Sequence, residues 1–528
     1  MSTLDKVLDE YSAKVYKNRK AHLLEIKKDE TQEITANVRA VPGILTNRGC
    51  CYAGCKGVVL GPLKDVAIIT HGPIGCGFYT WGTRRSKAKG DENTQNFLEY
   101  CFSTDMQESD IVFGGEKKLR QAIKEVVEIF KPKSIMICST CPVGLIGDDI
   151  HAVAKESKEL YGIDVLAFSC EGYKGVSQSA GHHIANNGLF KNIIGTGEYV
   201  PKKYSVNILG EYNIGGDGWE IGRVLKKIGY EIVTVMTGDG SLEEMKSAHN
   251  ADLNLVQCHR SINYIGEMMK TKYGIDWIKV NFIGVESTAQ SLRDMAKYFG
   301  DAELIARTEE VIAEEIEDLR EDFEYYKSKL TGKTAGLFVG GSRAHHYQLL
   351  LKDLGMSTLV AGYEFAHRDE YEGREVIPFI KEDADSKNIE NLAVEKDELK
   401  YKAYLSEEKF EELKKEIPLE YYAGMFKDME DGAIVVDDFN HYETEKLMEI
   451  LKPDIYFSGI KDKYIAQKSG VLSRQLHSYD YSGPYAGFRG AVNFARDVTM
   501  GIYTPAWSYT VAPWKKEPIL EGSLGGEA

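Results

Sequence analysis

Short apolar runs recur along the chain, and most are followed by a segment with helical periodicity. The runs occupy residues 66–70, 134–138, 164–168, 204–209, 231–236, 253–257, 280–284, 335–341, 357–362, 432–437 and 454–459. Continuous apolar runs that alternate with helices are typical of parallel strands covered on both faces. The pattern predicts an α/β fold of doubly wound, Rossmann-like units with parallel sheets.

Two amphipathic helices stand out in this pattern. Residues 116–130 place Leu119, Ile123 and Val126 on one stripe, and residues 307–330 repeat the arrangement with an acidic opposite side. An apolar stripe of this kind faces a core, while the charged side faces water. Both segments are therefore predicted to cover a sheet.

The predicted strands are too many for one open sheet, so we expect several units. The expected divisions are an N-terminal extension at 1–41, α/β units at 42–203, 204–330 and 331–515, and a C-terminal tail at 516–528. The stretch at about 381–420 is charge-rich and weakly apolar, which predicts a surface insertion in the third unit. Within it, Ser406 is suited to cap a short helix.

Composition and charge narrow the class of protein. The 528 residues are 43% hydrophobic and 28% charged, with a formal net charge of −16. This acidity argues against nucleic acid as the main partner. The first residues lack the apolar core of a secretory signal, and no apolar run approaches a membrane span. We expect a cytoplasmic protein whose nine cysteines are thiols rather than disulfides.

Several thiols lie at the ends of apolar runs or in turn-forming loops. Cys50, Cys76, Cys141 and Cys258 have this setting, and His477 lies in an aromatic, glycine-rich loop far downstream. Thiols and an imidazole without the compact spacing of a zinc ribbon indicate iron–sulfur chemistry assembled from distant segments. In parallel sheets the carboxyl ends of strands form the ligand site, which agrees with this interpretation.

The remaining cysteines have competing interpretations. Cys51 and Cys55 lie so close to Cys50 that spacing alone does not exclude them as ligands. The other three, Cys101, Cys138 and Cys170, are interpreted as structural, because a buried thiol is more often a small hydrophobe than a ligand.

Other polar residues lie in glycine-rich or polar loops after apolar runs, and one of them suits an anion. Gln178 and His182 follow the run at 164–168, and Arg343 follows Gly340 and Gly341, which allow close backbone approach. The guanidinium of Arg343 offers a fork of donors for an anion.

Nucleotide signatures are weak in this sequence. Gly216, Gly218 and Gly222 resemble a variant dinucleotide loop, but a plain tight turn is the favoured interpretation. Residues 331–334 lack the upstream glycine of a Walker A loop, so we expect no ATP hydrolysis by this chain.

These segments together resemble the nitrogenase component 1 family, in its molybdenum-dependent alpha-chain branch. The resemblance runs from about residue 38 to residue 507. Its most specific segments include RGCCYAGCKGVV, HGPIGC, TCPVGLIGDDI, SCEGYKGVSQSAGHHIAN, QCHRSINYI, GGSRAHH and HSYDYSGPYAGF.

The resemblance implies two metal centres. It makes Cys50, Cys76 and Cys141 ligands of a P-cluster (8Fe–7S) shared with a beta chain, and Cys258 and His477 ligands of an iron–molybdenum cofactor (7Fe–Mo–9S–C) with homocitrate. Four positions match residues that influence the reaction: Val58, Arg84, Gln178 and His182. Further cofactor contacts match Arg260, Ser261, Gly340, Gly341, Arg343, Glu364, Phe365, Lys461 and Gln475.

The implied activity is reduction of dinitrogen to ammonia with hydrogen evolution. The implied assembly has two alpha and two beta chains and receives electrons from a separate, ATP-hydrolysing iron protein. Alternatives are a cofactor-assembly scaffold of the same fold, a vanadium or iron-only enzyme, and a dehydrogenase that uses the glycine loop. Neither nucleic acid nor a membrane is expected as a partner.

Overall fold

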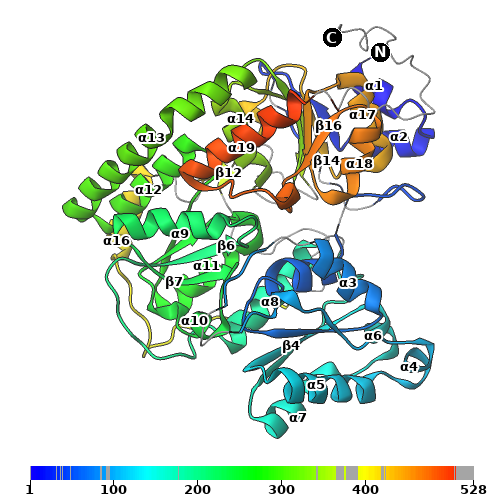
Figure 1. The fold of residues 1–528 in the computed structure, drawn as a ribbon, viewed down its shortest axis with the longest axis vertical. Helices are drawn as coiled ribbons and strands as arrows, with labels where there is room; N and C mark the ends of the chain where they lie inside the picture. Colours follow the sequence, from blue (N-terminus) through cyan, green and yellow to red (C-terminus); the bar gives the residue numbers. More distant parts are fainter. Residues whose placement is uncertain are drawn as a thin grey trace, which may run out of the picture.

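The computed structural model describes the chain except residues 1, 31, 36, 38–39, 48, 84–85, 91–94, 176–177, 340–342, 364–373, 376–389, 418–420, 423, 505 and 507–528. For residues 83, 259–261, 363, 374–375, 421–422, 460–461 and 481 the description covers the backbone alone. The described strands form three main sheets, each flanked by helices (Figure 1).

The first sheet is parallel and lies at the lower right of Figure 1. Its spatial order is β3 (Phe102–Ser103), β2 (Ala67–His71), β4 (Ser134–Ser139) and β5 (Asp164–Phe168). Its helices are η1 (Ala53–Leu60), α3 (Ile74–Thr83), η2 (Phe97–Glu99), α4 (Glu108–Phe113), α5 (Glu116–Phe130), α6 (Cys141–Ile146), α7 (Ile150–Tyr161) and α8 (Ser179–Asn192). On α5 the predicted stripe of Leu119, Ile123 and Val126 is buried, which confirms that helix and its inner face.

The second sheet is also parallel. Its order is β7 (Glu231–Thr237), β6 (Ser205–Glu211), β8 (Leu253–Val256) and β9 (Asp276–Lys279). Its helices are α9 (Asp217–Ile228), α10 (Leu242–Lys246), η3 (Ala248–Asn250), α11 (His259–Tyr273) and α12 (Val285–Phe299).

The third sheet is parallel apart from one edge strand. Its order is β1 (Leu23–Glu25), β14 (Ile434–Asp437), β11 (Ser357–Tyr363), β10 (Thr334–Phe338), β15 (Ile455–Ser458) and β16 (Leu472–Gln475), and β1 is antiparallel. The helices are α13 (Ala302–Leu330), α14 (Arg343–Asp353), α17 (His441–Leu451), α18 (Ile460–Lys468), η6 (Tyr479–Tyr481) and α19 (Gly487–Ile502). Smaller elements are β12 (Arg374–Glu375), α16 (Glu407–Glu416), β13 (Tyr421–Tyr422) and η5 (Phe426–Asp428).

The N-terminal residues are part of this third unit. The helices α1 (Thr3–Leu8) and α2 (Ala13–Lys20) lead into β1, which pairs with β14. Arg19 on α2 forms a two-pronged ion pair with Glu443 on α17, with both N–O distances at 2.6 Å and both side chains buried. Removing one partner of such a pair leaves an uncompensated buried charge, so the pair holds α2 in place.

The predicted α/β class with parallel sheets is confirmed, and one of the predicted strands does not form. The run at 280–284 is not a strand, because the strand of that region is β9, immediately before it. Its apolar side chains, Val280, Phe282 and Ile283, are buried all the same, and Ile283 forms an isolated antiparallel bridge with Ala486. The apolar run therefore reflects packing between units rather than strand pairing.

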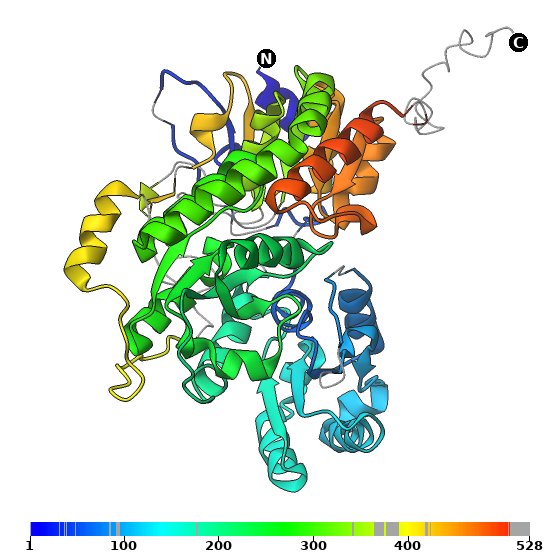
Figure 2. The ribbon, with the colours of Figure 1, turned by 60° about the vertical axis from the view of Figure 1, so that its left-hand side comes forward.

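The charged insertion lies against the second unit. Its described part, residues 390–417, includes α16, and the predicted cap is confirmed because the Ser406 side chain accepts a hydrogen bond from the Lys409 amide at 3.4 Å. Lys270 of α11 lies 3.9 Å from the ring centre of Phe410. The segment stands out from the body in Figure 2. Its first residues, 381–389, lie outside the described part of the chain.

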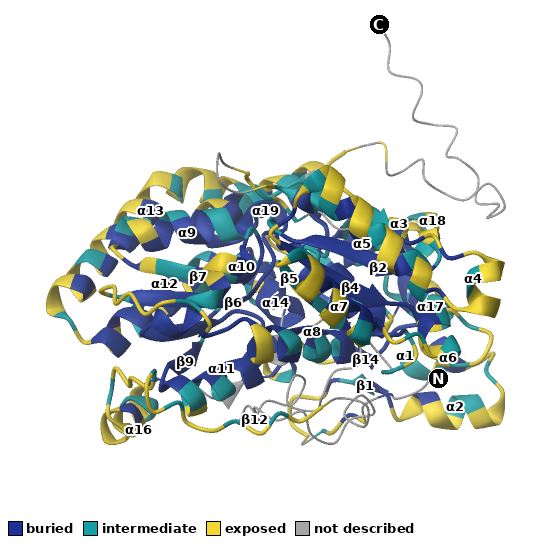
Figure 3. Cartoon of the chain, turned by 90° about the horizontal axis from the view of Figure 1, so that it is seen from below, coloured by how far each residue is buried: buried dark blue, intermediate teal, exposed yellow. Residues whose placement is uncertain are grey.

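Buried residues concentrate in the sheets and the inner faces of the helices (Figure 3). The described part of the chain contains no helix with both the length and the apolar character needed to cross a membrane.

Candidate metal centres

Three exposed thiols lie together beside the first sheet, and we call Cys50, Cys76 and Cys141 the outer thiols. Although the residue is exposed, its sulfur is partly desolvated, and this desolvation, reinforced by the neighbouring Cys50 and Cys141, raises the pKa of Cys76. A Cβ atom on Gly172 would lie 3.0 Å from the sulfur of Cys141 and 3.5 Å from that of Cys50. Glycine at 172 thus lets the chain after β5 pass close against two of these sulfurs.

The local sequence explains why these thiols converge. Cys141 is the first residue of α6, directly after β4, and Pro142 suits the first turn of that helix. Cys76 is on α3, which follows β2, and Cys50 precedes η1. Because β2 and β4 are adjacent parallel strands, their carboxyl ends bring the two helix starts together.

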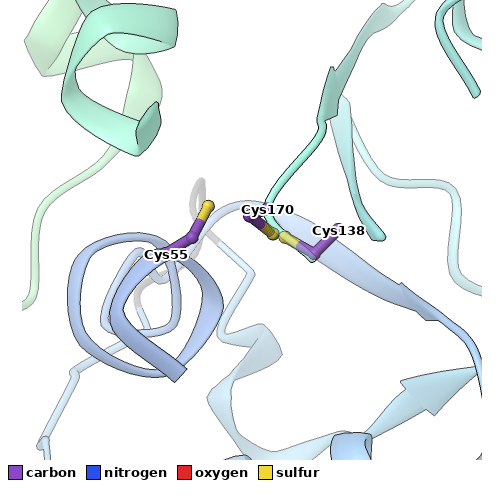
Figure 4. A group of neighbouring side chains, drawn as sticks. All are labelled: Cys55, Cys138 and Cys170. Carbon is purple, nitrogen blue, oxygen red and sulfur yellow. The ribbon is translucent and has the colours of Figure 1, made fainter. Parts of the chain in front are cut away.

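A second group of thiols, the inner thiols, consists of Cys55, Cys138 and Cys170, all fully buried. Their sulfur atoms lie within 4.8 Å of one another. Cys55 projects from η1, Cys138 belongs to β4 and Cys170 follows β5 (Figure 4). Burial alone would raise the pKa of Cys138, but hydrogen bonds from Cys170 and Cys55 hold it at about 5. This convergence differs from the separate structural roles expected for Cys138 and Cys170.

Cys258 is buried at the N-cap of α11, just after β8. The neighbouring strand β6 approaches it closely at Gly210. A Cβ atom on Gly210 would lie 2.8 Å from the Cβ of Cys258, and the backbone φ of Gly210 is 81°. Only glycine satisfies both conditions, so the end of β6 is shaped around this thiol.

His477 lies in the loop after β16 and is half-buried. Gly459 makes room for its ring, since a Cβ there would lie 2.9 Å from Nδ1 of the imidazole. Asp480 has a left-handed φ of 48°, and its carboxylate accepts hydrogen bonds from the amide of Gln475, at 3.0 Å, and from Lys463. These bonds hold a strained loop in one shape and therefore fix the position of His477.

A buried charged network joins the second unit to the third. The Nη1 atom of Arg343, the first residue of α14, donates to the hydroxyl of Tyr479 at 2.7 Å. Its guanidinium lies 3.7 Å from a carboxylate oxygen of Glu211 and 3.8 Å from one of Asp217. Complete burial, reinforced by Asp217, raises the pKa of Glu211 to about 7.

This network connects the surroundings of the two predicted ligands. Glu211 follows Gly210, which contacts Cys258, and Tyr479 follows His477 by two residues. The sequence pattern did not single out Glu211, Asp217 or Tyr479. A carboxylate at the end of a fully buried strand was the available signal for Glu211.

Val58 and His182 are buried on two helices, η1 and α8, whose backbones approach closely at two glycines. A Cβ on Gly54 of η1 would overlap the carbonyl oxygen of Gln178, and a Cβ on Gly181 of α8 would overlap that of Cys51. Gln178 is the N-cap residue of α8, and its carbonyl accepts the His182 amide at 3.2 Å. The two glycines thus allow η1 and α8 to pack closely, which brings Val58, Gln178 and His182 to the same helix contact.

Most of the other predicted site residues lie wholly or partly outside the described part of the chain. Arg84, Gly340, Gly341, Glu364 and Phe365 lie outside the described residues. For Arg260, Ser261 and Lys461, the backbone belongs to α11 or α18 and the side chains lie outside the description. Gln475 is buried, and its side-chain oxygen accepts from Ser478.

The glycine loop at 216–222 is a turn into a helix. Gly216 is the N-cap of α9 with a φ of 101°, and Gly218 and Gly222 are inside that helix. The favoured interpretation as a plain turn is confirmed.

Comparisons with known proteins agree on one family. Residues 50–503 match the family described as nitrogenase component 1 type oxidoreductase. The chain is 62% identical over 529 residues to the nitrogenase molybdenum-iron protein alpha chain of Clostridium pasteurianum, covering 99% of both chains. It is 55% identical to the corresponding chain of Methanosarcina barkeri, covering 98% of this chain and 97% of the other.

A solved structure shares the whole architecture. The structure titled "Nitrogenase Cp1 at pH 6.5" superposes with a TM-score of 0.92 at 61% identity, covering 97% of this chain and all of that one. Similarity of this extent includes every segment that carries a thiol or imidazole discussed above.

Proposed function

This chain belongs to the family of nitrogenase component 1 type oxidoreductases, and on that premise we propose that it reduces dinitrogen to ammonia, with hydrogen evolution, at an iron–molybdenum cofactor. Its relatives identify it as a catalytic nitrogenase alpha subunit. The observation that carries the proposal is the 62% identity to a molybdenum-iron protein alpha chain over 99% of both chains. Membership of this family implies metal clusters.

The outer thiols suit one half of a shared iron–sulfur cluster, the P-cluster (8Fe–7S). Thiolates are the ligands that such clusters require. Three thiols that converge and yet remain exposed fit a cluster whose other ligands come from a second chain. We therefore propose that Cys50, Cys76 and Cys141 bind this cluster at the contact with a beta chain.

Cys258 and His477 suit the two ends of the iron–molybdenum cofactor (7Fe–Mo–9S–C with homocitrate). Cys258 would supply the thiolate to a terminal iron, and His477 the imidazole to molybdenum. The buried Nη2 of Arg343 makes no hydrogen bond among the described residues and lies 3.7 Å from a carboxylate oxygen of Glu211, so it retains the capacity to donate to an anionic ligand.

The nearby residues have defined tasks in this proposal. When bound, the clusters supply electron storage and the metal surface at which dinitrogen and protons are reduced. His182 would hold a proton at its imidazole for delivery, and the buried Val58 would limit access. Arg343 would compensate negative charge in a site of low polarity. Arg84, Gln178, Arg260, Ser261, Gly340, Gly341, Glu364, Phe365, Lys461 and Gln475 are proposed as further contacts.

The proposed assembly contains two alpha and two beta chains and meets a separate iron protein transiently. The absence of a Walker A sequence agrees with ATP hydrolysis by that partner. Exposed apolar side chains next to Cys76 support a protein partner at the outer thiols. On α3, Ile74, Phe78 and Tyr79 are each at least half exposed, and such clusters mark interaction sites.

The decisive experiment is anaerobic co-purification with the beta chain, followed by metal analysis and low-temperature electron paramagnetic resonance. We expect molybdenum in the complex and a high-spin cofactor signal, together with ammonia formation when the iron protein and MgATP are added. Vanadium, or iron without a heterometal, would instead identify an alternative nitrogenase. A cofactor-loaded complex that fails to reduce dinitrogen would indicate an assembly scaffold.

A further inference from the structure

The inner thiols form a compact group that has no task in the proposed reduction of dinitrogen. Cys55, Cys138 and Cys170 are fully buried, and their sulfurs lie within 4.8 Å of one another. Soft thiolate ligands select thiophilic metal ions. We propose that the inner thiols bind one thiophilic divalent cation, of the Zn²⁺ type, in a trigonal site beneath the outer thiols.

The spacing of the sulfurs fits a single ion. With metal–sulfur bonds of about 2.3 Å, three sulfurs in a plane around one zinc lie about 4.0 Å apart. The inner thiols therefore need to close by less than about 1 Å, which side-chain rotation supplies. A multi-iron cluster would spread the sulfurs further, because each thiolate would bind a different iron. A disulfide would join two of the sulfurs and leave the third unused.

The charge around the site favours a divalent ion. Three thiolates carry three negative charges, and the side chain of Lys56 is buried beside Cys55 and interacts electrostatically with Cys138. A divalent ion together with this ammonium neutralises the three thiolates. A monovalent ion would leave one buried negative charge uncompensated, which is costly in a medium of low polarity.

The position of the site gives the ion a structural role. The three thiols come from η1, β4 and the chain after β5. The same segments continue directly into Cys50, Cys141 and Gly172. Two of these residues are outer thiols, and the third packs against both of them. An ion bound beneath would therefore tie together the segments that position the outer thiols. This inference does not depend on what the outer thiols bind.

Zinc content and zinc coordination test the proposal directly. The complex with the beta chain is purified anaerobically, incubated with Zn²⁺ and cleared of loose metal with a weak chelator. We expect about one retained zinc per alpha chain, and zinc-edge X-ray absorption with about three sulfur neighbours at about 2.3 Å. This signal is specific to zinc, so iron and molybdenum elsewhere in the complex do not obscure it.

Single substitutions locate the zinc. Cys138→Ser and Cys170→Ala are each expected to lose the retained zinc while the iron and molybdenum contents stay at the wild-type level. Cys51→Ala is the matched control, because Cys51 is also fully buried and adjoins the same helix, and it should keep the zinc.

The proposal would be overturned by wild-type complex without retained zinc, by zinc bound to nitrogen or oxygen neighbours, or by zinc retained equally in Cys138→Ser. A disulfide between two inner thiols in the reduced complex would overturn it as well. The absorption measurement on wild-type protein keeps the proposal falsifiable even if a variant fails to fold.

Discussion

Cys258 and His477 are each accommodated by a glycine from a neighbouring segment. Gly210 faces the Cβ of Cys258, and Gly459 faces the ring of His477. A Cβ atom added to either glycine would lie less than 3.0 Å from the facing side chain. Neither glycine was singled out from the sequence, because its importance arises from a contact between segments distant in the chain. The ligand types were recognisable from their setting, whereas the space around them was not.

Replacing Cys258 by alanine tests its role as a cofactor ligand. The variant Cys258→Ala should retain the iron of the outer thiols and bind the iron–molybdenum cofactor at least about 100-fold more weakly, because even changes around a ligand cost 10–100-fold in affinity. Molybdenum and iron per chain, measured after anaerobic purification, provide the readout. Cys101→Ala is the control and should keep both metals. A full molybdenum complement in Cys258→Ala would contradict the assignment.

His182 is expected to influence the reaction rather than cluster content. In His182→Asn, dinitrogen reduction should fall by about 100-fold or more, the usual contribution of a positioned proton donor, while proton reduction falls much less. Ammonia and hydrogen are measured at equal molybdenum content. His183→Asn is a matched control, because the adjacent ring packs against Tyr264 at 4.3 Å between centroids. An unchanged product ratio in His182→Asn would count against its role.

The contact between η1 and α8 is the element-scale feature on which several site residues depend. The variant Gly181→Ala forces a side-chain atom into the carbonyl of Cys51. Overpacking of this kind typically costs about 1–3 kcal/mol. We expect a lower thermal midpoint and faster amide hydrogen exchange in residues 51–60 and 179–192.

Gly222→Ala on α9 is the control for this prediction. Its added methyl would meet only the end of Ile232, at 3.4 Å, so exchange in η1 and α8 should match the wild type. Equal exchange in Gly181→Ala and wild type would show that the two helices can separate at no cost.

At this scale the sequence predicted the strands with strong apolar runs and missed those formed by pairing alone. The runs at 164–168 and 231–236 correspond closely to β5 and β7. The edge strands β1, β3 and β16 are short, and their sequences carry little apolar signal, since pairing with a neighbour defines them.

The inner thiols escaped prediction for a related reason. Their convergence depends on how η1 packs against the first sheet, which no local pattern records.

At the scale of the whole molecule, the helix α3 exposes large apolar side chains that an isolated protein would be expected to bury. Phe78 on α3 is 53% exposed and contacts the rings of Tyr79 and Trp81. The same helix carries Cys76, so this aromatic surface begins within one helical turn of an outer thiol. The single chain accounts for its acidic composition and for its sheets. It gives no reason for the exposure of these apolar side chains. The proposed assembly, in which a second chain covers the thiols, would explain the exposure of this apolar surface.

Phe78→Glu therefore tests the assembly through its apolar face alone. Burying an unpaired carboxylate in place of an aromatic ring should weaken association with the beta chain by about 30-fold or more, the effect of losing a hot-spot residue. Because the outer thiols would then lack their second set of ligands, iron per alpha chain should fall together with the fraction of complex. Size-exclusion chromatography and metal analysis of the co-expressed chains measure both quantities.

Leu160→Glu is the matched control, since Leu160 on α7 is 74% exposed and lies on a different helix of the same unit. If Phe78→Glu assembled as fully as Leu160→Glu and kept its iron, the face of α3 would not be the contact with the beta chain, and the exposure of the outer thiols would need another explanation.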